Sequence, residues 1–594
     1  MKKIIELLND ELKAAFSACG YDEKYAKVVV SNRPDLCQYQ CNGCMAAAKE
    51  YKKAPAIIAG EVVEKLAESS TFSKVEAVNP GFINMNLSGQ FIADYVKEMG
   101  SHEKFGCDET KKNKTIMLDY GGANVAKPLH VGHLRPAIIG ESLKRICAYN
   151  GYDTVGDVHL GDWGLQMGLI IMELKNRKPE LPYFDESFTD EYPAEAPFTL
   201  AELEDIYPCA SRKSKEDAEF AEAAHQATVM LQRGHRGYTA IWKHIMNISI
   251  ADLKRNYDNL NVSFDVWKGE SDAKPYIEDM LKSFVDKGYA YESQGALVID
   301  VAQADDKKDI PPCIVRKSDG AALYATTDLA TMIEREKLYH PFKYIYTTDK
   351  RQEMHFTQIF RAAKKTGIVP QDTEMDFLGF GTMNGKDGKP FKTRNGDLLR
   401  LEYLIKDVED AVYNKIKENR DVADDEARAT AKVVGLAAIK YGDLSNQASK
   451  DYIFDIDRFT SFEGDTGPYV LYTIVRIKSI LNKYEQTYGA QSLSVADRMK
   501  DFVAPEGASE TDLCLLLTKF SEVIESAYAE LAPHKICKFI YDVANVFNSF
   551  YHDTKILSEE DETKRKSYIA LITLTKGILE TCTDLLAIKV PDRM

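Results

Sequence analysis

No stretch of this sequence is long and apolar enough to cross a membrane as a helix, which takes about 20 mostly apolar residues. The N-terminus also lacks the apolar core of a secretory leader, since residues 1–10 read MKKIIELLND and carry acids early. Both absences argue against membrane association and against secretion. We therefore expect a cytoplasmic protein.

An excess of positive charge is also missing. Lysine and arginine number 76 against 92 aspartate and glutamate residues, which gives a formal net charge of −16. Nucleic acids are bound largely through lysine and arginine at phosphates, so this balance argues against nonspecific binding and against a DNA partner. Net charge is a sum over the whole molecule, however, and a local basic patch still permits one specific RNA to bind.

The eleven cysteines lack the spacing of a disulfide framework, as expected of reduced thiols. Cys37, Cys41 and Cys44 form the one close group. A structural zinc site takes four ligands, and no second Cys or His pair follows nearby. We expect buried structural cysteines and no metal held by the protein, with zinc as the alternative.

What the sequence does contain is enough chain for several hydrophobic cores. At 594 residues, 44% hydrophobic and 28% charged, it has the composition of a globular protein of roughly three or four domains. Its most informative stretch is residues 115–135. A short apolar run there ends at a Gly-Gly turn, and a helical pattern with Ile138, Ile139, Leu143 and Ile146 follows, which predicts strand, loop and helix.

Two histidines, His130 and His133, stand at the start of this predicted helix. A helix N-terminus offers unpaired N–H groups and the positive end of the helix dipole, which together favour a phosphate. Imidazoles there add hydrogen-bond donors for a phosphate whose charge grows in a transition state. So short a motif also arises as a capping or packing accident, and these residues alone leave both interpretations open.

The longer string NVAKPLHVGHLR, residues 124–135, resembles the signature of class I aminoacyl-tRNA synthetases in the form found in arginyl-tRNA synthetases. The strings DLCQYQCN, PGFIN, LGDWGLQ and the closing VPDRM are similar to features of the same family, in the family's order. The resemblance implies a complete chain with an α/β, multidomain fold. Its expected parts are a Rossmann-like catalytic domain whose parallel sheet is split by an insertion, a small α+β N-terminal domain and an all-α C-terminal anticodon-binding bundle.

On this basis the chain is divided into four segments: residues 1–110 as an N-terminal tRNA-contacting domain, 111–405 as the catalytic domain, 406–455 as a helical connection and 456–594 as the anticodon-binding domain. The insertion is expected at about 170–310. Within it, the acid- and proline-rich residues 179–208 predict loops, and residues 216–258 predict a long helix. Nothing in the insertion indicates chemistry beyond that of solvated helices.

The catalytic fold is expected to resume near residue 312. Tyr324 and Asp328 lie four apart at a predicted helix start, where they share one face. Residues 343–349 read as a strand, and another helix follows from about Arg351.

Residues 385–396 form a loop with three glycines and four basic side chains. It is a candidate phosphate clamp or a solvated hairpin. In class I synthetases a Lys-Met-Ser-Lys-Ser loop occupies this place, but here FKTRNG stands instead and no register restores both lysines. Many arginyl enzymes share that departure, and the resemblance implies that Lys127 substitutes.

The resemblance also implies roles for individual residues. Those expected to be catalytic at the reacting phosphates are His130, His133, Lys127, Lys392 and Arg394. Those expected to bind ATP are Gly132, His130, His133, Lys389 and His355.

Arginine recognition needs carboxylates, because a planar guanidinium is held best by paired acidic oxygens and a ring face. The residues expected to bind arginine are Asp119, Asn124, Tyr324, Asp328 and Gln352. Those expected to contact tRNA are Tyr469, Arg476, Asn548 and Tyr551, on two helical stretches whose aromatic stripes usually indicate helix packing but also suit stacking on RNA bases.

The implied activity is the ligation of L-arginine to tRNA(Arg), with ATP as substrate and Mg²⁺ as its companion ion. Arginyl-adenylate forms first, and the arginyl group then passes to the terminal ribose of the tRNA. The family usually needs tRNA before it forms the adenylate, and we expect the same requirement here. We also expect the protein to be a monomer. The alternatives are a class I synthetase for another amino acid and a catalytically silent relative that only binds tRNA.

Overall fold

The computed structural model describes all residues except 319–321, 391–398, 420–421 and 490. The chain forms two compact units. We call residues 111–460 with 585–588 the central unit, and residues 1–110, 461–584 and 589–594 the terminal unit. Across the described part of the chain, no helix has both the length and the apolar content to span a membrane.

The N-terminal part of the terminal unit is a four-stranded antiparallel sheet covered by helices. The strand order is β1-β2-β4-β3, built from Val28–Val30, Tyr39–Cys41, Phe82–Leu87 and Phe72–Val78. The helices are α1 (Ile4–Ala18), α2 (Gly43–Tyr51), α3 (Pro55–Leu66) and α4 (Gly89–Ser101). Cys37, Cys41 and Cys44 are buried free thiols here, which confirms the prediction of buried cysteines. This is the small α+β domain that the sequence indicated.

The rest of the terminal unit is helical, as predicted. Its helices are α16 (Gly467–Tyr488), α17 (Val495–Met499), α18 (Ala508–Leu517), α19 (Phe520–Ala529), α20 (Pro533–Asp553) and α21 (Glu562–Leu585). Helix α16 begins at Gly467: Pro468 occupies the first turn, and the Thr466 hydroxyl accepts a hydrogen bond from the Tyr469 N–H.

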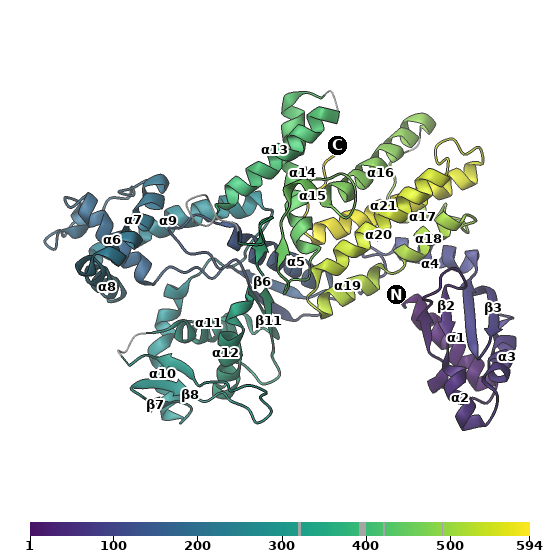
Figure 1. The fold of residues 1–594 in the computed structure, drawn as a ribbon, viewed down its shortest axis with the longest axis horizontal. Helices are drawn as coiled ribbons and strands as arrows, with labels where there is room; N and C mark the ends of the chain where they lie inside the picture. Colours follow the sequence, from purple (N-terminus) through teal and green to yellow (C-terminus); the bar gives the residue numbers. More distant parts are fainter. Residues whose placement is uncertain (319–321, 391–398, 420–421, 490) are drawn as a thin grey trace. The chain divides into compact units, whose positions relative to one another are not determined.

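The central unit is built on a four-stranded parallel sheet in the order β11-β10-β5-β6. Its two outer strands, β6 and β11, are labelled in Figure 1. Its strands are β5 (Thr115–Asp119), β6 (Asp153–Asp157), β10 (Lys343–Asp349) and β11 (Glu374–Phe380). Helix α5 (Leu134–Tyr149) connects β5 to β6, and α12 (Glu353–Thr366) connects β10 to β11. The predicted strand, loop and helix at residues 115–146 and the predicted strand at 343–349 are both confirmed.

Between β6 and β10 lies the insertion, which opens with four helices: α6 (Leu165–Arg177), α7 (Leu200–Glu216), α8 (Ala218–Gln232) and α9 (Arg236–Asn259). The prediction of one long helix over residues 216–258 is wrong, because Gly234 at φ +87 breaks it between α8 and α9. The prediction of loops over 179–208 is wrong beyond residue 199. Thr199 and Glu202 form a capping box that starts α7, and the helix continues through Pro208.

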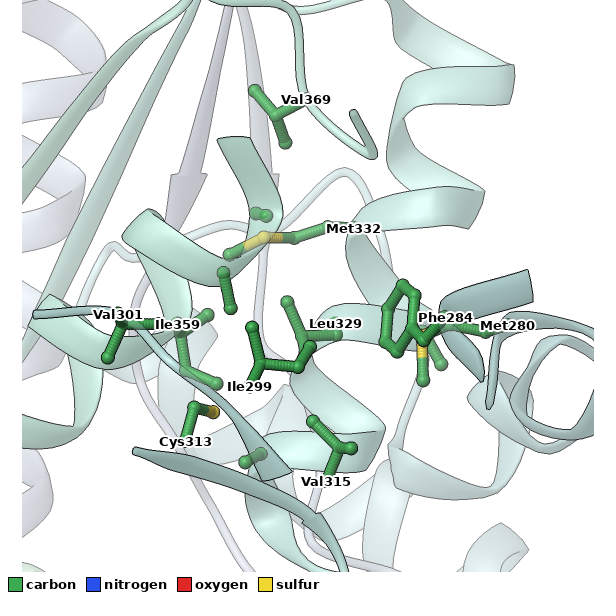
Figure 2. Packing of buried hydrophobic residues seen from close by; sticks show 14 of the residues in the cluster. Met280, Phe284, Ile299, Val301, Cys313, Val315, Leu329, Met332, Ile359 and Val369 are labelled. Carbon is green, nitrogen blue, oxygen red and sulfur yellow. The ribbon is translucent and has the colours of Figure 1, made fainter. Parts of the chain in front are cut away.

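The return from the insertion differs from expectation as well. β9 (Cys313–Arg316) pairs antiparallel with β8 (Ala296–Ile299), which pairs with β7 (Tyr291–Ser293), so the parallel sheet resumes only at β10. Ile299 of β8, Leu329 of α11 (Tyr324–Tyr339) and Ile359 of α12 are fully buried in one apolar cluster (Figure 2). This cluster fixes the small sheet, α11 and α12 as one body, which sets the position of the first residues of α11.

Candidate active site

Strands β5 and β10 are parallel neighbours: Asp119 ends β5 opposite Tyr346, and β10 continues three residues further to Asp349. After β5 the chain crosses to β6 on one side of these two central strands, and after β10 it crosses to β11 on the other side. Such a switch in strand order leaves a crevice at the carboxyl edge of a parallel sheet. A cavity of about 690 Å³ lies at this position.

Segments far apart in the sequence line this cavity. Of the predicted site residues, the lining includes Asp119, His130, Gly132, His133, Tyr324, Asp328, Gln352 and His355. The helix-start prediction for Tyr324 and Asp328 is confirmed, because α11 begins at Tyr324 and both side chains face the cavity. Tyr324 is 74% exposed, so its ring is free to meet a ligand.

The two signature histidines form a close pair at the start of α5, with ring centroids 3.9 Å apart and the ring planes tilted by 32°. The Gly132 N–H donates to Nδ1 of His130 at 3.0 Å, and the His130 N–H donates to Nδ1 of His133 at 3.1 Å. Each Nδ1 is therefore an acceptor, which places the proton of a neutral ring on Nε2. A Cβ at residue 132 would lie 2.8 Å from Cε1 of His130, so a larger residue there would displace the His130 ring.

Both imidazoles are held neutral. Burial lowers the pKa of His133 to about 3, and the charges of His130 and Lys127 add to this effect. Burial, with a smaller effect of Lys127, also lowers the pKa of His130. The pair thus offers Nε2–H donors without adding positive charge of its own, which suits a group that must bind phosphate oxygens and still release them.

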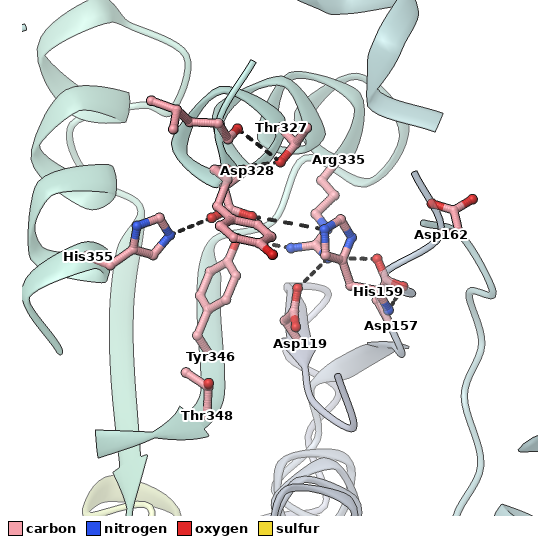
Figure 3. Close-up of polar contacts among 12 residues, drawn as sticks. Asp119, Asp157, His159, Asp162, Thr327, Asp328, Arg335, Tyr346, Thr348 and His355 are labelled. Atoms are coloured by element: carbon pink, nitrogen blue, oxygen red, sulfur yellow. Dashed lines mark hydrogen bonds and ion pairs between the residues drawn. The ribbon is translucent and has the colours of Figure 1, made fainter. Parts of the chain in front are cut away.

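Acidic side chains also line the cavity, and we call Asp119, Glu270 and Asp328 its acidic wall (Figure 3 shows Asp119 and Asp328). His355 Nε2 lies 2.6 Å from Oδ2 of Asp328, and His159 Nε2 lies 4.0 Å from Oδ1 of the same carboxylate. Asp328 is therefore contacted by a histidine of α12 and by a histidine of the segment after β6. His159 was not predicted from the sequence. Its backbone is left-handed at φ +41, an uncommon conformation for a residue other than glycine and one often found at functional sites.

Asp119 is bound by an arginine that sequence reasoning missed. Arg335 of α11 is buried and donates to Asp119 Oδ2 at 2.6 Å, to Asp157 Oδ2 at 2.7 Å and to the Tyr346 hydroxyl at 2.9 Å (Figure 3). Much of the charge of Asp119 is thus balanced inside the protein. No local pattern signals this arrangement, because each partner comes from a different strand or helix.

Glu270 is a second residue that the sequence did not reveal. It lies within the insertion, after α9, and its N–H donates to the Leu160 carbonyl at 3.0 Å, which brings its side chain to the cavity. Burial raises the pKa of Glu270 to about 7; His159 opposes this shift, and Asp162 and Asp328 add to it. The insertion therefore contributes a carboxyl group to the site, contrary to the expectation of solvated helices alone.

Two predicted residues lie beside the cavity and not in its lining. The Asn124 side chain packs against Gly161: a Cβ added at residue 161 would lie 2.3 Å from the Asn124 side-chain oxygen. Lys127 extends toward α7, with its ammonium 4.5 Å from the centre of the Tyr207 ring. Both belong to the loop that joins β5 to the two histidines.

The basic loop is described only over residues 385–390. Lys392 and Arg394 lie outside the described residues. Lys389 is described but does not line the cavity; its carbonyl accepts from the Gly385 N–H at 2.8 Å, which closes the first turn of the loop. Lys386 forms ion pairs with Asp455 and Asp457 at 3.1 and 2.9 Å.

The four residues predicted to contact tRNA gather on α16 and α20 of the terminal unit. The Tyr469 hydroxyl accepts from the Asn548 amide at 2.9 Å, and Arg476 donates to the Asn548 oxygen at 2.6 Å. Arg476 also lies 5.3 Å from the centre of the Tyr551 ring, which is 41% exposed. The structure brings these side chains together as one polar and aromatic surface, although they come from helices about 70 residues apart.

Comparison with family models matches nearly the whole chain. Residues 2–87 match the arginyl tRNA synthetase N terminal domain, residues 96–456 match the catalytic domain of tRNA synthetases class I (R), and residues 470–594 match the DALR anticodon binding domain.

Individual relatives agree with the family models. An arginine–tRNA ligase of Agathobacter rectalis is 61% identical, and one of Alkaliphilus oremlandii is 55% identical; each comparison covers 100% of both chains. Among solved structures, arginyl-tRNA synthetases of Plasmodium falciparum and Thermus thermophilus share the fold, with TM-scores of 0.78 and 0.75 over 100% of both chains at 24% and 21% identity.

Proposed function

The chain belongs to the arginyl-tRNA synthetase family, and from this premise we propose how its cavity carries out the family's reaction. The protein is an ATP-dependent arginine–tRNA ligase. An oxygen of the arginine carboxylate attacks the α-phosphorus of ATP, and pyrophosphate leaves as arginyl-adenylate forms. A terminal ribose hydroxyl of tRNA(Arg) then attacks the arginyl carbonyl, and AMP leaves. Little covalent chemistry falls to the protein, so catalysis consists of positioning and charge stabilisation.

One observation supports this use of the cavity above others: carboxyl groups and a neutral imidazole pair line a single space. We propose that Asp328 and Glu270 accept hydrogen bonds from the arginine guanidinium and that the exposed Tyr324 ring covers its face. Asp119, already balanced by Arg335, contributes a fixed acceptor. Lysine lacks the planar fork of donors that would satisfy several acceptors at once, so its exclusion follows from unpaired carboxylates.

The other end of the amino acid lies nearer the sheet. We propose that Asn124 binds its α-amino or carboxylate group and that Gln352 closes the pocket from the start of α12. Gln352 accepts from the Thr348 hydroxyl at 3.1 Å, which orients its amide. His355, placed among the ATP-binding residues from the sequence, contacts Asp328 in this structure, so we propose that it acts at the acidic wall.

The phosphates of ATP belong at the histidine pair. His130 and His133 present Nε2–H donors at the start of α5, where the helix dipole favours negative charge. We propose that Lys127 and the loop bearing Lys389, Lys392 and Arg394 neutralise the departing pyrophosphate. Mg²⁺ arrives bound to the nucleotide, as the ion commonly keeps phosphate and water ligands in preference to an all-protein cage.

The terminal unit is proposed to bind the tRNA. Tyr469, Arg476, Asn548 and Tyr551 are held by one another, so they can stack and hydrogen-bond with unpaired bases at low ordering cost. Residues 1–110 are proposed as a second tRNA contact, and residues 406–455 as a connection. With its net charge of −16, the protein is proposed to act as a monomer in the cytoplasm.

An ATP–pyrophosphate exchange assay with each of the twenty amino acids, with and without tRNA, tests the proposal. We expect exchange with arginine alone among them, and only when tRNA is present. Exchange with a different amino acid would indicate another specificity for the acidic wall. No exchange under any condition would indicate a relative that binds tRNA without catalysis.

Arginine binding is expected to strengthen as pH rises through neutrality. Glu270, with its pKa raised to about 7 by burial, is mostly protonated at about pH 6 and mostly ionised at about pH 8, whereas the guanidinium stays charged throughout. The ionised carboxylate is the better acceptor, so the KM for arginine should fall by up to about tenfold over this window. Steady-state exchange at a series of pH values measures this change.

The matched control is Glu270→Gln, which keeps the size of the side chain and leaves His159 in place. This variant should bind arginine more weakly and show no fall in KM over the same window. Near pH 8 this variant should also unfold at a higher temperature than the unmodified protein. The Glu270 carboxyl binds its proton more tightly in the folded than in the unfolded protein, so its ionisation lowers the stability of the unmodified protein as pH rises. A KM that still falls with pH in Glu270→Gln would assign the titration to another group.

A further inference from the structure

Helix α7 of the insertion contacts Lys127, the lysine on which the proposed phosphate chemistry depends. The Lys127 ammonium lies 4.5 Å from the centre of the Tyr207 ring, a distance at which the negative face of an aromatic ring attracts a cation. Tyr207 is itself held in place, because it packs against the buried cluster formed by Leu169, Ala210, Phe220 and Ala224. The ring is therefore a fixed platform and not a mobile surface group.

The backbone beside Lys127 is also held by the insertion. The Ala126 N–H donates to the hydroxyl of Ser249, on α9, at 2.9 Å. Ala126 is left-handed at φ +61, a strained conformation that persists only where surrounding contacts enforce it. The insertion thus contacts this segment twice, through α9 at the backbone of Ala126 and through α7 at the ammonium of Lys127.

The same face of α7 also contacts the segment that follows the basic loop. Glu204, three residues before Tyr207, forms an ion pair with Arg400 at 3.0 Å. Residues 399–401 pair through their backbone with the signature segment: the Val131 N–H donates to the Leu399 carbonyl, and the Leu401 N–H donates to the Leu129 carbonyl, both at 3.0 Å. One helix therefore contacts both Lys127 and the segment that follows the basic loop.

We propose that Tyr207 is a positioning residue for the ligase reaction: its ring fixes the ammonium of Lys127 beside the imidazole pair, so that the insertion aligns the cation that receives the departing pyrophosphate. The charge of Lys127 acts on both His130 and His133, which agrees with an ammonium close to the pair. The inference rests on the proposed role of Lys127. It goes further because it gives α7 a part in adenylate formation.

The test compares Tyr207→Leu with Tyr207→Phe in arginine- and tRNA-dependent ATP–pyrophosphate exchange. Leucine fills much of the space in the apolar cluster but has no π face, whereas phenylalanine keeps the ring. We expect Tyr207→Leu to lower kcat by about 3- to 30-fold, the range of one cation–π contact, with the KM for arginine within about twofold. Tyr207→Phe should retain kcat.

A double-mutant cycle with Lys127→Ala separates positioning from general damage to the fold. Lys127→Ala alone should lower kcat strongly, and adding Tyr207→Leu should lower it no further. Full activity of Lys127→Ala would refute the proposed role of the lysine itself. If that variant loses activity but Tyr207→Leu equals the unmodified enzyme, raises kcat, or adds its full loss in the double variant, the positioning role of Tyr207 is overturned and the role of Lys127 remains.

Discussion

Replacing His133 with alanine is expected to lower arginine- and tRNA-dependent ATP–pyrophosphate exchange by at least about 100-fold, the usual cost of losing one preorganised donor to a developing oxyanion. The donor in question is Nε2–H, because Nδ1 of His133 accepts from the His130 N–H. Affinity for tRNA should change little, since the side chains proposed to bind it lie on α16 and α20 of the terminal unit. Exchange kinetics and a filter-binding titration of tRNA measure the two quantities.

Two further substitutions separate the roles of the two ring nitrogens. Asparagine at 133 can place its oxygen near the position of Nδ1 and keep the bond from the His130 N–H, but it has no donor at the position of Nε2. Glutamine places its amide near the position of Nε2. His133→Asn should therefore keep thermal stability but lack exchange, and His133→Gln should recover part of the exchange. Near-normal exchange in His133→Asn or His133→Ala would refute the role of the imidazole as donor.

Replacing Asp328 with asparagine is expected to raise the KM for arginine by about 10- to 150-fold, the range for losing a hydrogen bond to a charged group. The KM for ATP should stay within about threefold, because Asp328 lies on the acidic wall with His355 and not at the imidazole pair. Discrimination against lysine should weaken as well, because the substitution removes a carboxylate that the forked donors of a guanidinium satisfy and a lysine ammonium would leave partly unpaired. Exchange kinetics with arginine, lysine and ATP as varied substrates give all three values.

Asp306→Asn is the matched control for Asp328→Asn. Asp306 also forms a strong ion pair, with both guanidinium nitrogens of Arg361 at 2.6 and 2.7 Å, but it does not line the cavity. Its substitution should leave both KM values unchanged even if stability falls. Equal rises in the KM of arginine and of ATP in Asp328→Asn would count against a pocket for the arginine side chain.

Local pattern was sufficient to predict several elements that carry the site. The apolar run before the Gly-Gly turn predicted β5, and the spacing of Tyr324 and Asp328 predicted a shared face at the start of α11, because strand and helix periodicity are properties of a few neighbouring residues. The break at Gly234 and the helix through Pro208 were missed. Each depends on whether packing against the surrounding helices offsets the free-energy cost of a glycine or proline within a helix, and the local sequence does not show that packing.

The sequence alone determined the family, the order of the domains and the segments that bear the histidine pair and the acidic residues, because these depend on local strings and their order along the chain. Only the tertiary structure decided that Arg335 balances Asp119, that Glu270 comes to the same cavity and that Lys127 rests on Tyr207. These contacts join residues many positions apart. They arise where packed strands and helices bring side chains together, so the surroundings that set each charge, and with it the chemistry of the site, exist only once the chain is folded.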